Sequence, residues 1–249
     1  MLELNDVSVI FNEGTKLEKT ALDHVSVRIN EGDFVTILGS NGAGKSTFFN
    51  VVTGSAPATS GTIRLDGKDI TSQKEHVRSR IIGRLFQDPS HGTASALTVE
   101  ENLALTGHSG SGLFSIAVKK QDVKRFKEKL KMLNMGLEER LKTPIGLLSG
   151  GQRQAVALMM AVLNPPKLLL LDEHTAALDP KSARTILDLT DQLVRSEKMT
   201  ALMITHNMSD ALKYGNRLLI FNDGKITKDF SKEEKEKLKP ADLLAYYEV

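Results

Sequence analysis

A chain of 249 residues is long enough for one large domain or two small ones. Apolar residues make up 40% of it and charged residues 26%, as in ordinary soluble proteins, and the net charge of +2 gives no reason to expect a nucleic-acid partner. Cysteine is absent, which excludes disulfides and thiolate metal sites and fits a reducing compartment.

The N-terminal part of the chain reads as strands that lead into a glycine-rich loop. Apolar residues alternate in part over residues 2–11 and 25–29, and residues 34–38 form a short run typical of a buried strand. The glycine-rich loop follows this run directly, and residues 45–52 predict a helix that opens on the loop. A further strand is expected over residues 80–86.

From Thr98 to Leu163 the pattern becomes helical, with a flexible break at Gly107–Gly112 and an amphipathic, lysine-rich helix over Gln121–Leu133. After Pro166 strands and helices alternate: strands over 167–171, 200–204, 218–221 and 226–230, a helix over 180–195, and a charged tail over 231–239 that predicts a solvated helix surface. Apolar strands that alternate with helices predict a mainly parallel sheet covered on both faces.

Neither the start nor the middle of the chain predicts a membrane segment. The first residues include acidic side chains where a signal peptide would be basic. The longest apolar stretch, Ala155–Leu163, is about half of the roughly 18 residues that a spanning helix needs. We therefore expect a chain that does not cross a membrane.

The glycine-rich loop matches the phosphate-binding pattern G-x-x-x-x-G-K-[ST] in full, between a strand and a helix. Glycines let backbone N–H groups approach phosphates, and the helix start adds its positive end. Lys45 is expected to reach the outer phosphates, and Ser46 to coordinate Mg²⁺. The predicted nucleotide-binding residues here are Gly39, Ser40, Asn41, Gly42, Ala43, Gly44, Lys45, Ser46 and Thr47.

A second apolar strand, Leu168–Leu171, ends in Asp172 and Glu173. An aspartate at the end of a buried strand is placed to hold the Mg²⁺ shell, and the next glutamate is placed to poise a water for attack on a γ-phosphate. Phosphoryl transfer depends mainly on positioning and charge compensation, so a carboxylate beside the metal is the expected base.

Leu148-Ser-Gly-Gly-Gln152, followed by a helix and then by the Asp-Glu strand, resembles the signature of ATP-binding-cassette (ABC) ATPases. The resemblance covers nearly the whole chain, with the motifs in the family's order. It implies a P-loop α/β fold with a RecA-like mixed-sheet core and an N-terminal antiparallel β part (residues 1–96 and 164–249), and an inserted helical subdomain (residues 97–163).

The resemblance also assigns roles to single residues. Lys45, Glu173 and His206 would be catalytic, with Glu173 as base and His206 as the switch histidine at the γ-phosphate. Ser46, Gln87 and Asp172 would serve the Mg²⁺ ion. Besides the glycine-rich loop, ATP would be bound by Phe11 (stacking on adenine), Gln87, Ser149, Gly150, Gly151, Gln152 and Asp179.

In this family Ser149 and Gly151 contact the γ-phosphate held by the other subunit, so the resemblance implies a head-to-tail dimer with ATP at the interface. A homodimer is the simplest arrangement, and a heterodimer with a paralogue is the alternative. Separate transmembrane permeases would dock beside Gln87–Ala96 and the helical region after Thr98, with an extracytoplasmic substrate-binding protein, and the chain would act at the cytoplasmic face of the membrane.

The implied function is an ATPase that powers transport. Import is favoured because Leu141–Gly146 lacks the glutamate-bearing stretch common before the signature of exporters. Alternatives are an exporter subunit, an ABC ATPase outside transport that acts on ribosomes or DNA, and a regulatory module without hydrolysis. The sequence Asp-Glu-His-Thr-Ala-Ala-Leu-Asp-Pro resembles that of a bacterial subgroup whose transporters include a lipoprotein-type substrate-binding component. Some members of this subgroup are associated with amino-acid transport.

One residue departs from the family pattern. Proline usually follows the catalytic glutamate, and here the residue is His174. A histidine restores a backbone N–H and brings a side chain that ordinarily titrates near neutral pH. Two interpretations stay open: a tolerated variant that serves the same loop shape, or a pH-sensitive group beside Glu173.

Overall fold

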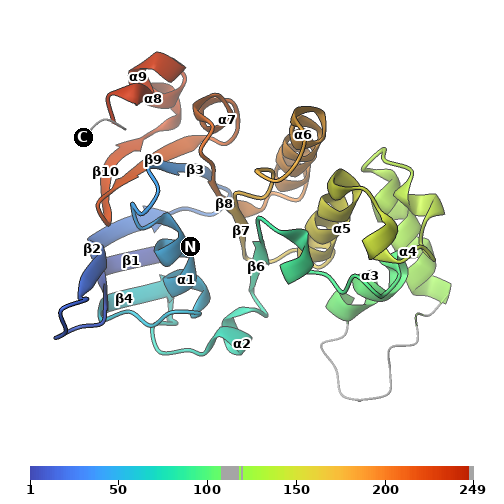
Figure 1. Ribbon diagram of the computed structural model, residues 1–249, viewed down its shortest axis with the longest axis horizontal. Helices are drawn as coiled ribbons and strands as arrows, with labels where there is room; N and C mark the ends of the chain where they lie inside the picture. The colour runs from blue at the N-terminus through green and yellow to red at the C-terminus, as the bar shows by residue number, and fades with distance from the viewer. Residues whose placement is uncertain (108–117, 119, 247–249) are drawn as a thin grey trace. The chain divides into compact units, whose positions relative to one another are not determined.

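The computed structural model describes residues 1–107, 118 and 120–246. Apart from Gly107, the break expected at Gly107–Gly112 lies outside these residues. The chain divides into two compact units (Figure 1). The first comprises residues 1–83, 167–172 and 198–249, and the second comprises residues 84–166 and 173–197.

An antiparallel sheet forms one part of the first unit. Its strands, in the order β2-β1-β4-β5, are β2 (Lys19–Ile29), β1 (Leu2–Phe11), β4 (Ser60–Leu65) and β5 (Lys68–Asp69). Along β2 buried and more exposed residues alternate from Val25 to Ile29, as expected for a strand with one face on the core. This sheet confirms the predicted N-terminal antiparallel part.

A second, mixed sheet has the strand order β10-β9-β3-β8-β7-β6. Parallel pairing joins β9 (Arg217–Asn222), β3 (Phe34–Gly39), β8 (Thr200–Ile204) and β7 (Leu168–Asp172), and β10 (Lys225–Phe230) runs antiparallel to β9. Strand β6 (Ile82–Leu85) carries the chain from the first unit into the second. All of β3 and β8 is buried, which is typical of parallel strands covered on both faces.

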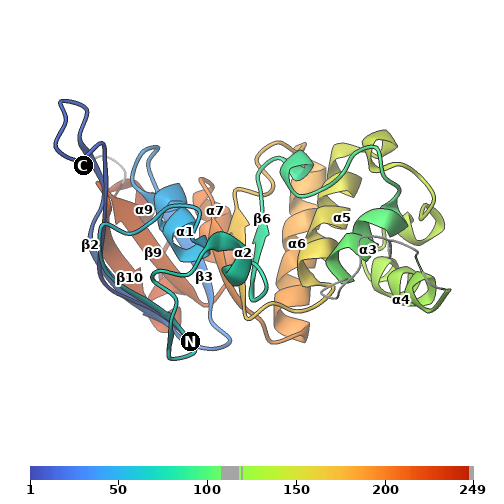
Figure 2. The same cartoon turned by 90° about the horizontal axis from the view of Figure 1, so that it is seen from below.

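Helix α1 (Lys45–Thr53) lies against both sheets of the first unit (Figure 2). Its Phe48, Phe49, Val51 and Val52 are fully buried in one core with residues of both sheets, and the Phe48 ring lies 5.2 Å from that of Phe221. The same unit contains α2 (Glu75–Arg78), α7 (Met208–Lys213), α8 (Lys232–Lys235) and α9 (Pro240–Leu244).

The second unit is helical among its described residues. It contains α3 (Val99–Gly107), α4 (Lys120–Lys131), α5 (Gly150–Val162) and α6 (Pro180–Ser196), and α5 packs against each of the other three. Short 3₁₀ turns connect them: η1 (Pro89–His91), η2 (Leu137–Glu139) and η3 (Ile145–Leu147).

Most predicted elements are confirmed within a few residues, and β8 matches its prediction at both ends. Strands β4 and β5 and helices α2, α7 and α9 were not predicted. The charged tail is only partly a solvated surface, because Lys235 is 4% exposed. In the part of the chain that the structure describes, no helix is long and apolar enough to cross a membrane.

Candidate functional site

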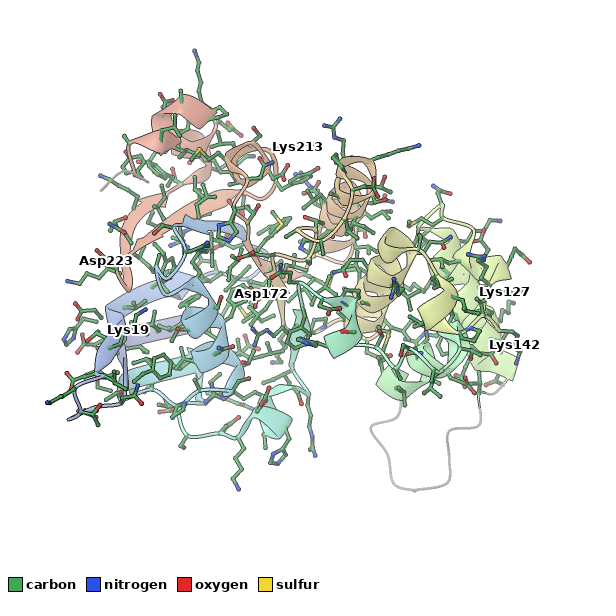
Figure 3. All side chains as sticks on the ribbon, in the orientation of Figure 1. Lys19, Lys127, Lys142, Asp172, Lys213 and Asp223 are labelled. Carbon is green, nitrogen blue, oxygen red and sulfur yellow. The ribbon has the colours of Figure 1, made fainter. Side chains whose placement is uncertain are left out.

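Three sequence-predicted segments follow the same edge of the mixed sheet in the first unit. In the register of β7, β8 and β3, Asp172 pairs with Ile204, and Ile204 pairs with Ile37. Because parallel strands end at a common edge, the loop after Gly39, the Asp172 carboxylate and the segment that leads to His206 leave the sheet side by side. Figure 3 labels Asp172 where β7 ends. Ligands in open α/β sheets bind at this carboxyl edge.

The backbone of the loop itself is suited to an anion. Gly42 and Gly44 have φ of 83° and 100°, a region that favours glycine. Gly44 also needs its size, because a Cβ there would lie 2.5 Å from the Ala21 carbonyl oxygen. Gly44 stands at the N-cap position of α1, so no side chain covers the first N–H groups of the helix there.

Lys45 is folded back onto this loop. Its side chain is 5% exposed, and Nζ donates to the carbonyl oxygens of Gly39 at 2.8 Å and Ser40 at 2.9 Å. The first residue of α1 thus holds a positive charge against the loop, and a positive charge there suits the outer phosphates of a nucleotide.

The donor set at this edge fits Mg²⁺. Ser46 supplies an exposed hydroxyl one residue into α1, and Asp172 supplies a half-buried carboxylate. Among the residues that the structure describes, no group of three or more His, Cys, Asp and Glu could hold a metal by itself. Proteins usually supply only one or two of the oxygen ligands of Mg²⁺, and water and phosphate oxygens supply the others. The third predicted ligand, Gln87, is exposed and belongs to the second unit.

Glu173 follows Asp172 and is the first residue of a tight turn. Its φ is 47°, which is uncommon for a residue with a side chain, and its carbonyl oxygen accepts from the Ala176 N–H at 2.9 Å. Such backbone conformations cost energy and cluster at functional sites. The turn therefore restricts the backbone conformation at Glu173.

The structure decides between the two interpretations of His174. This residue is 1% exposed, and burial lowers the pKa of its imidazole from 6.5 to about 4. Thr190 Oγ1 donates to the Ile186 carbonyl oxygen at 2.7 Å, so it accepts from His174 Nε2 at 3.2 Å, which assigns the proton to Nε2. The expectation of a side chain that titrates near neutral pH is wrong; His174 joins the turn to α6.

Gln87 lies in a loop that contacts α5 within the second unit. Asp88 accepts from the Ser90 backbone N–H at 2.8 Å, which holds the pKa of that carboxyl below its usual value. One residue before Gln87, the Phe86 carbonyl oxygen accepts from Gln154 Nε2 at 3.3 Å. Gln154 is 1% exposed and stands on α5, two residues beyond the signature, so the helix that carries the signature also contacts the loop of Gln87.

The signature begins α5. Ser149 is exposed at the N-cap, and its Oγ accepts from the Gln152 N–H at 3.3 Å. A Cβ at Gly151 would lie 3.0 Å from Ser182, so glycine lets α5 approach α6 closely. At the start of α6, Asp179 accepts from the Ser182 N–H at 3.0 Å. Hydrogen bonds from the Ser182 side chain and backbone hold the pKa of Asp179 below its usual value.

The predicted site residues are thus shared between the two units. The glycine-rich loop, Asp172, His206 and Phe11 lie in the first, where Phe11 ends β1 with 42% of its surface exposed. Gln87, Glu173, Asp179 and the signature lie in the second. Sequence reasoning missed Met135, Arg140, Gln154 and Thr190, which hold these motifs through contacts with residues distant in the sequence. No local pattern signals such contacts.

Comparisons with known proteins identify the family of the chain. The profile of the ABC transporter family matches residues 22–176. The chain is 40% identical over 248 residues to the tyrosine transport ATP-binding protein of Clostridioides difficile, covering 100% of this chain and 99% of that protein. It is 35% identical over 228 residues to a putative hemin import ATP-binding protein of Staphylococcus epidermidis, covering 90% and 98%.

Among solved structures, the fold resembles a dimeric ATP-binding cassette bound to ADP and phosphate in a post-hydrolysis state. The TM-score is 0.78 and the identity 28%, over 93% of this chain and 99% of that one.

Proposed function

Because this chain belongs to the ABC transporter family, as an ATP-binding subunit with ATPase activity, we propose that it powers the import of a small solute through separate permeases. Its own-side nucleotide site would consist of Phe11 under the adenine and the backbone of Gly39–Thr47 around the phosphates. The observation that carries this assignment is the common sheet edge of the glycine-rich loop, Asp172 and His206.

Hydrolysis would proceed through the residue roles that the family resemblance implies. Glu173 orients a water and accepts its proton as the water oxygen bonds to the γ-phosphorus, while the bond to the ADP oxygen breaks and phosphate leaves. Lys45 and His206 compensate the negative charge on the γ-phosphate oxygens. Ser46, Asp172 and Gln87 would hold Mg²⁺, which would neutralise further negative charge on the phosphates.

The signature completes the site in trans. Ser149 and Gly151 of one subunit would close on the γ-phosphate held by the partner, so two chains assemble head to tail with ATP between them. The simplest partner is a second copy, since one chain carries each motif once and in intact form. A dimeric cassette among the structural relatives supports this assembly.

Import at the cytoplasmic face of the membrane, with an extracytoplasmic binding protein, is the transport process that we propose. Support comes from the hemin import relative and from the absence of an exporter-like glutamate stretch in Leu141–Gly146. For the cargo we propose an amino acid, because a relative that matches over the full length is named for tyrosine transport.

The enzymatic part is tested with purified protein. Glu173→Gln should lower Mg²⁺-dependent ATP hydrolysis by about 10³-fold, since general-base catalysis contributes roughly 10²–10⁴. Glu31→Gln is the matched control, because that carboxylate is exposed and outside the site. A Glu173→Gln protein that hydrolyses ATP at the parental rate would refute the assigned base.

The transport part is tested in the source cells with a chromosomal Glu173→Gln allele. Uptake of radiolabelled tyrosine should fall to a small fraction of the parental rate, with efflux from preloaded cells unchanged. Reduced efflux with normal uptake would instead establish export, and no change in either would reject tyrosine as the cargo.

A further inference from the structure

The side chain of Gln152, the last residue of the signature, is held within its own subunit. Its Oε1 accepts from Arg140 Nη1 at 3.0 Å and from the Ser149 backbone N–H at 3.3 Å. Its Nε2 donates to the Met135 carbonyl oxygen at 3.3 Å. All four residues belong to the second unit.

These contacts define one orientation of the carboxamide. The oxygen faces two donors and the nitrogen faces an acceptor, so a flipped amide would place its nitrogen against the Arg140 guanidinium and its oxygen against a carbonyl oxygen. Arg140 is always charged, which makes its hydrogen bond to the amide oxygen stronger than one from a neutral donor.

The contacts of Gln152 with Arg140 and Met135 come from one short segment, residues 135–140, which is itself anchored by packing. Met135 and Arg140 flank the turn η2, and the side chain of Leu137 in that turn is fully buried. The residue between Met135 and Leu137 is Gly136, whose φ of 68° sets the reversal of the chain. The buried Leu137 therefore anchors the segment 135–140, which hydrogen bonds to Gln152, in the helical unit.

Gln152 in turn holds Ser149 from two sides. The Gln152 N–H donates to Ser149 Oγ, and the Gln152 carboxamide oxygen accepts from the Ser149 N–H, each at 3.3 Å. This reciprocal pair is a capping box, which fixes the backbone and the side chain at the start of a helix. Ser149 is exposed, so its orientation depends on this pair.

We propose that Arg140 is a positioning residue that, through Gln152, sets the orientation of Ser149 and thereby the affinity of the signature for the nucleotide held by the partner subunit. Gln152 then does not contact ATP, although the family resemblance placed it among the ATP-binding residues. The inference rests on the proposed function, because it needs a signature that acts in trans.

The experiment separates binding in cis from closure in trans. In a Glu173→Gln background, light scattering gives the ATP concentration at half-maximal dimerisation, and a fluorescent ATP analogue gives the affinity of the dilute monomer. Arg140→Met should raise the ATP concentration at half-maximal dimerisation about tenfold, as expected for the loss of one charge-assisted hydrogen bond. It should leave the affinity of the monomer for the ATP analogue unchanged. Arg140→Lys should restore dimerisation in part, because an ammonium keeps a donor without the guanidinium's fork.

Arg195→Met is the matched control, since that guanidinium pairs with Asp191 at 2.7 Å on α6 of the same unit, away from the signature. It should dimerise as the background does. Equal dimerisation of Arg140→Met and the background, or equal losses in Arg140→Met and Arg195→Met, would overturn the positioning role. So would a matching loss of monomer affinity. A background protein that binds ATP and stays monomeric would reject the proposed function, and the positioning role with it.

Discussion

At the scale of single residues, the most instructive position is His174, directly after the proposed base. Its imidazole is buried, neutral near pH 7 and hydrogen bonded to Thr190 on α6. Where the family usually has a proline that fixes the backbone, this chain has a side chain that ties the Glu173 turn to a helix. Both devices restrict the same turn, one through its own ring and the other through packing.

The buried imidazole predicts a pH-dependent stability. The pKa of His174 is about 4 in the folded protein and 6.5 for an unperturbed imidazole, as in the unfolded chain. Between these pH values the unfolded chain therefore binds more protons than the folded protein. The contribution is complete above pH 6.5 and is lost as the pH falls towards 4. The difference between these two pKa values corresponds to about 3 kcal/mol in the free energy of unfolding.

Urea unfolding at pH 7.5 and 4.5 measures this contribution. The parent protein should lose about 2–3 kcal/mol more on acidification than His174→Gln, which has no ionisable group there. His76→Gln is the control, because His76 is exposed, and it should behave as the parent does. Identical acid sensitivity in the parent and His174→Gln would contradict the buried, neutral state.

At the scale of elements, sequence reasoning succeeded where periodicity and local motifs act together. Apolar runs located β3, β7 and β8, and the glycine-rich loop located the start of α1, because burial and backbone chemistry there are local properties. The charged tail around α8 shows why the rest failed: lysines and glutamates predict a solvated face, yet Lys235 lies inside.

Lys235 is buried because three oxygen atoms receive its ammonium group. Nζ donates to the Tyr214 and Gly215 carbonyl oxygens and to Thr36 Oγ1, which tether α8 to β3 and to the segment before β9. Its ammonium group thus satisfies backbone acceptors in the segment between α7 and β9. Only the tertiary structure brings these partners together.

Replacing this lysine should weaken the first unit. Lys235→Met keeps the aliphatic volume but leaves buried acceptors without a donor, which should lower the free energy of unfolding by about 2 kcal/mol. Lys232→Met on the same helix removes an exposed lysine and should change stability by less than about 0.5 kcal/mol. Urea unfolding compares the two, and similar small losses would show that the buried contacts carry no net stability.

At the scale of the whole molecule, the two glycine-rich motifs lie in different units of one chain, the glycine-rich loop in the first and the signature in the second. Each motif alone was predictable from sequence because each is a short, contiguous pattern. Their partnership across two subunits comes from the family resemblance, and the supporting contacts of Arg140 and Met135 come from the structure. We propose that a complete site requires a second chain.

The most direct test of that requirement is the molar mass of Glu173→Gln in saturating ATP and Mg²⁺, measured by light scattering. The protein should change from the 27.3 kDa of one chain to twice that mass. Adding Ser149→Arg should return it to the monomer while the own-side ATP affinity stays intact. A Glu173→Gln protein that remains at the mass of one chain with ATP bound, or a dimer that persists with Ser149→Arg, would contradict a site completed by the partner's signature.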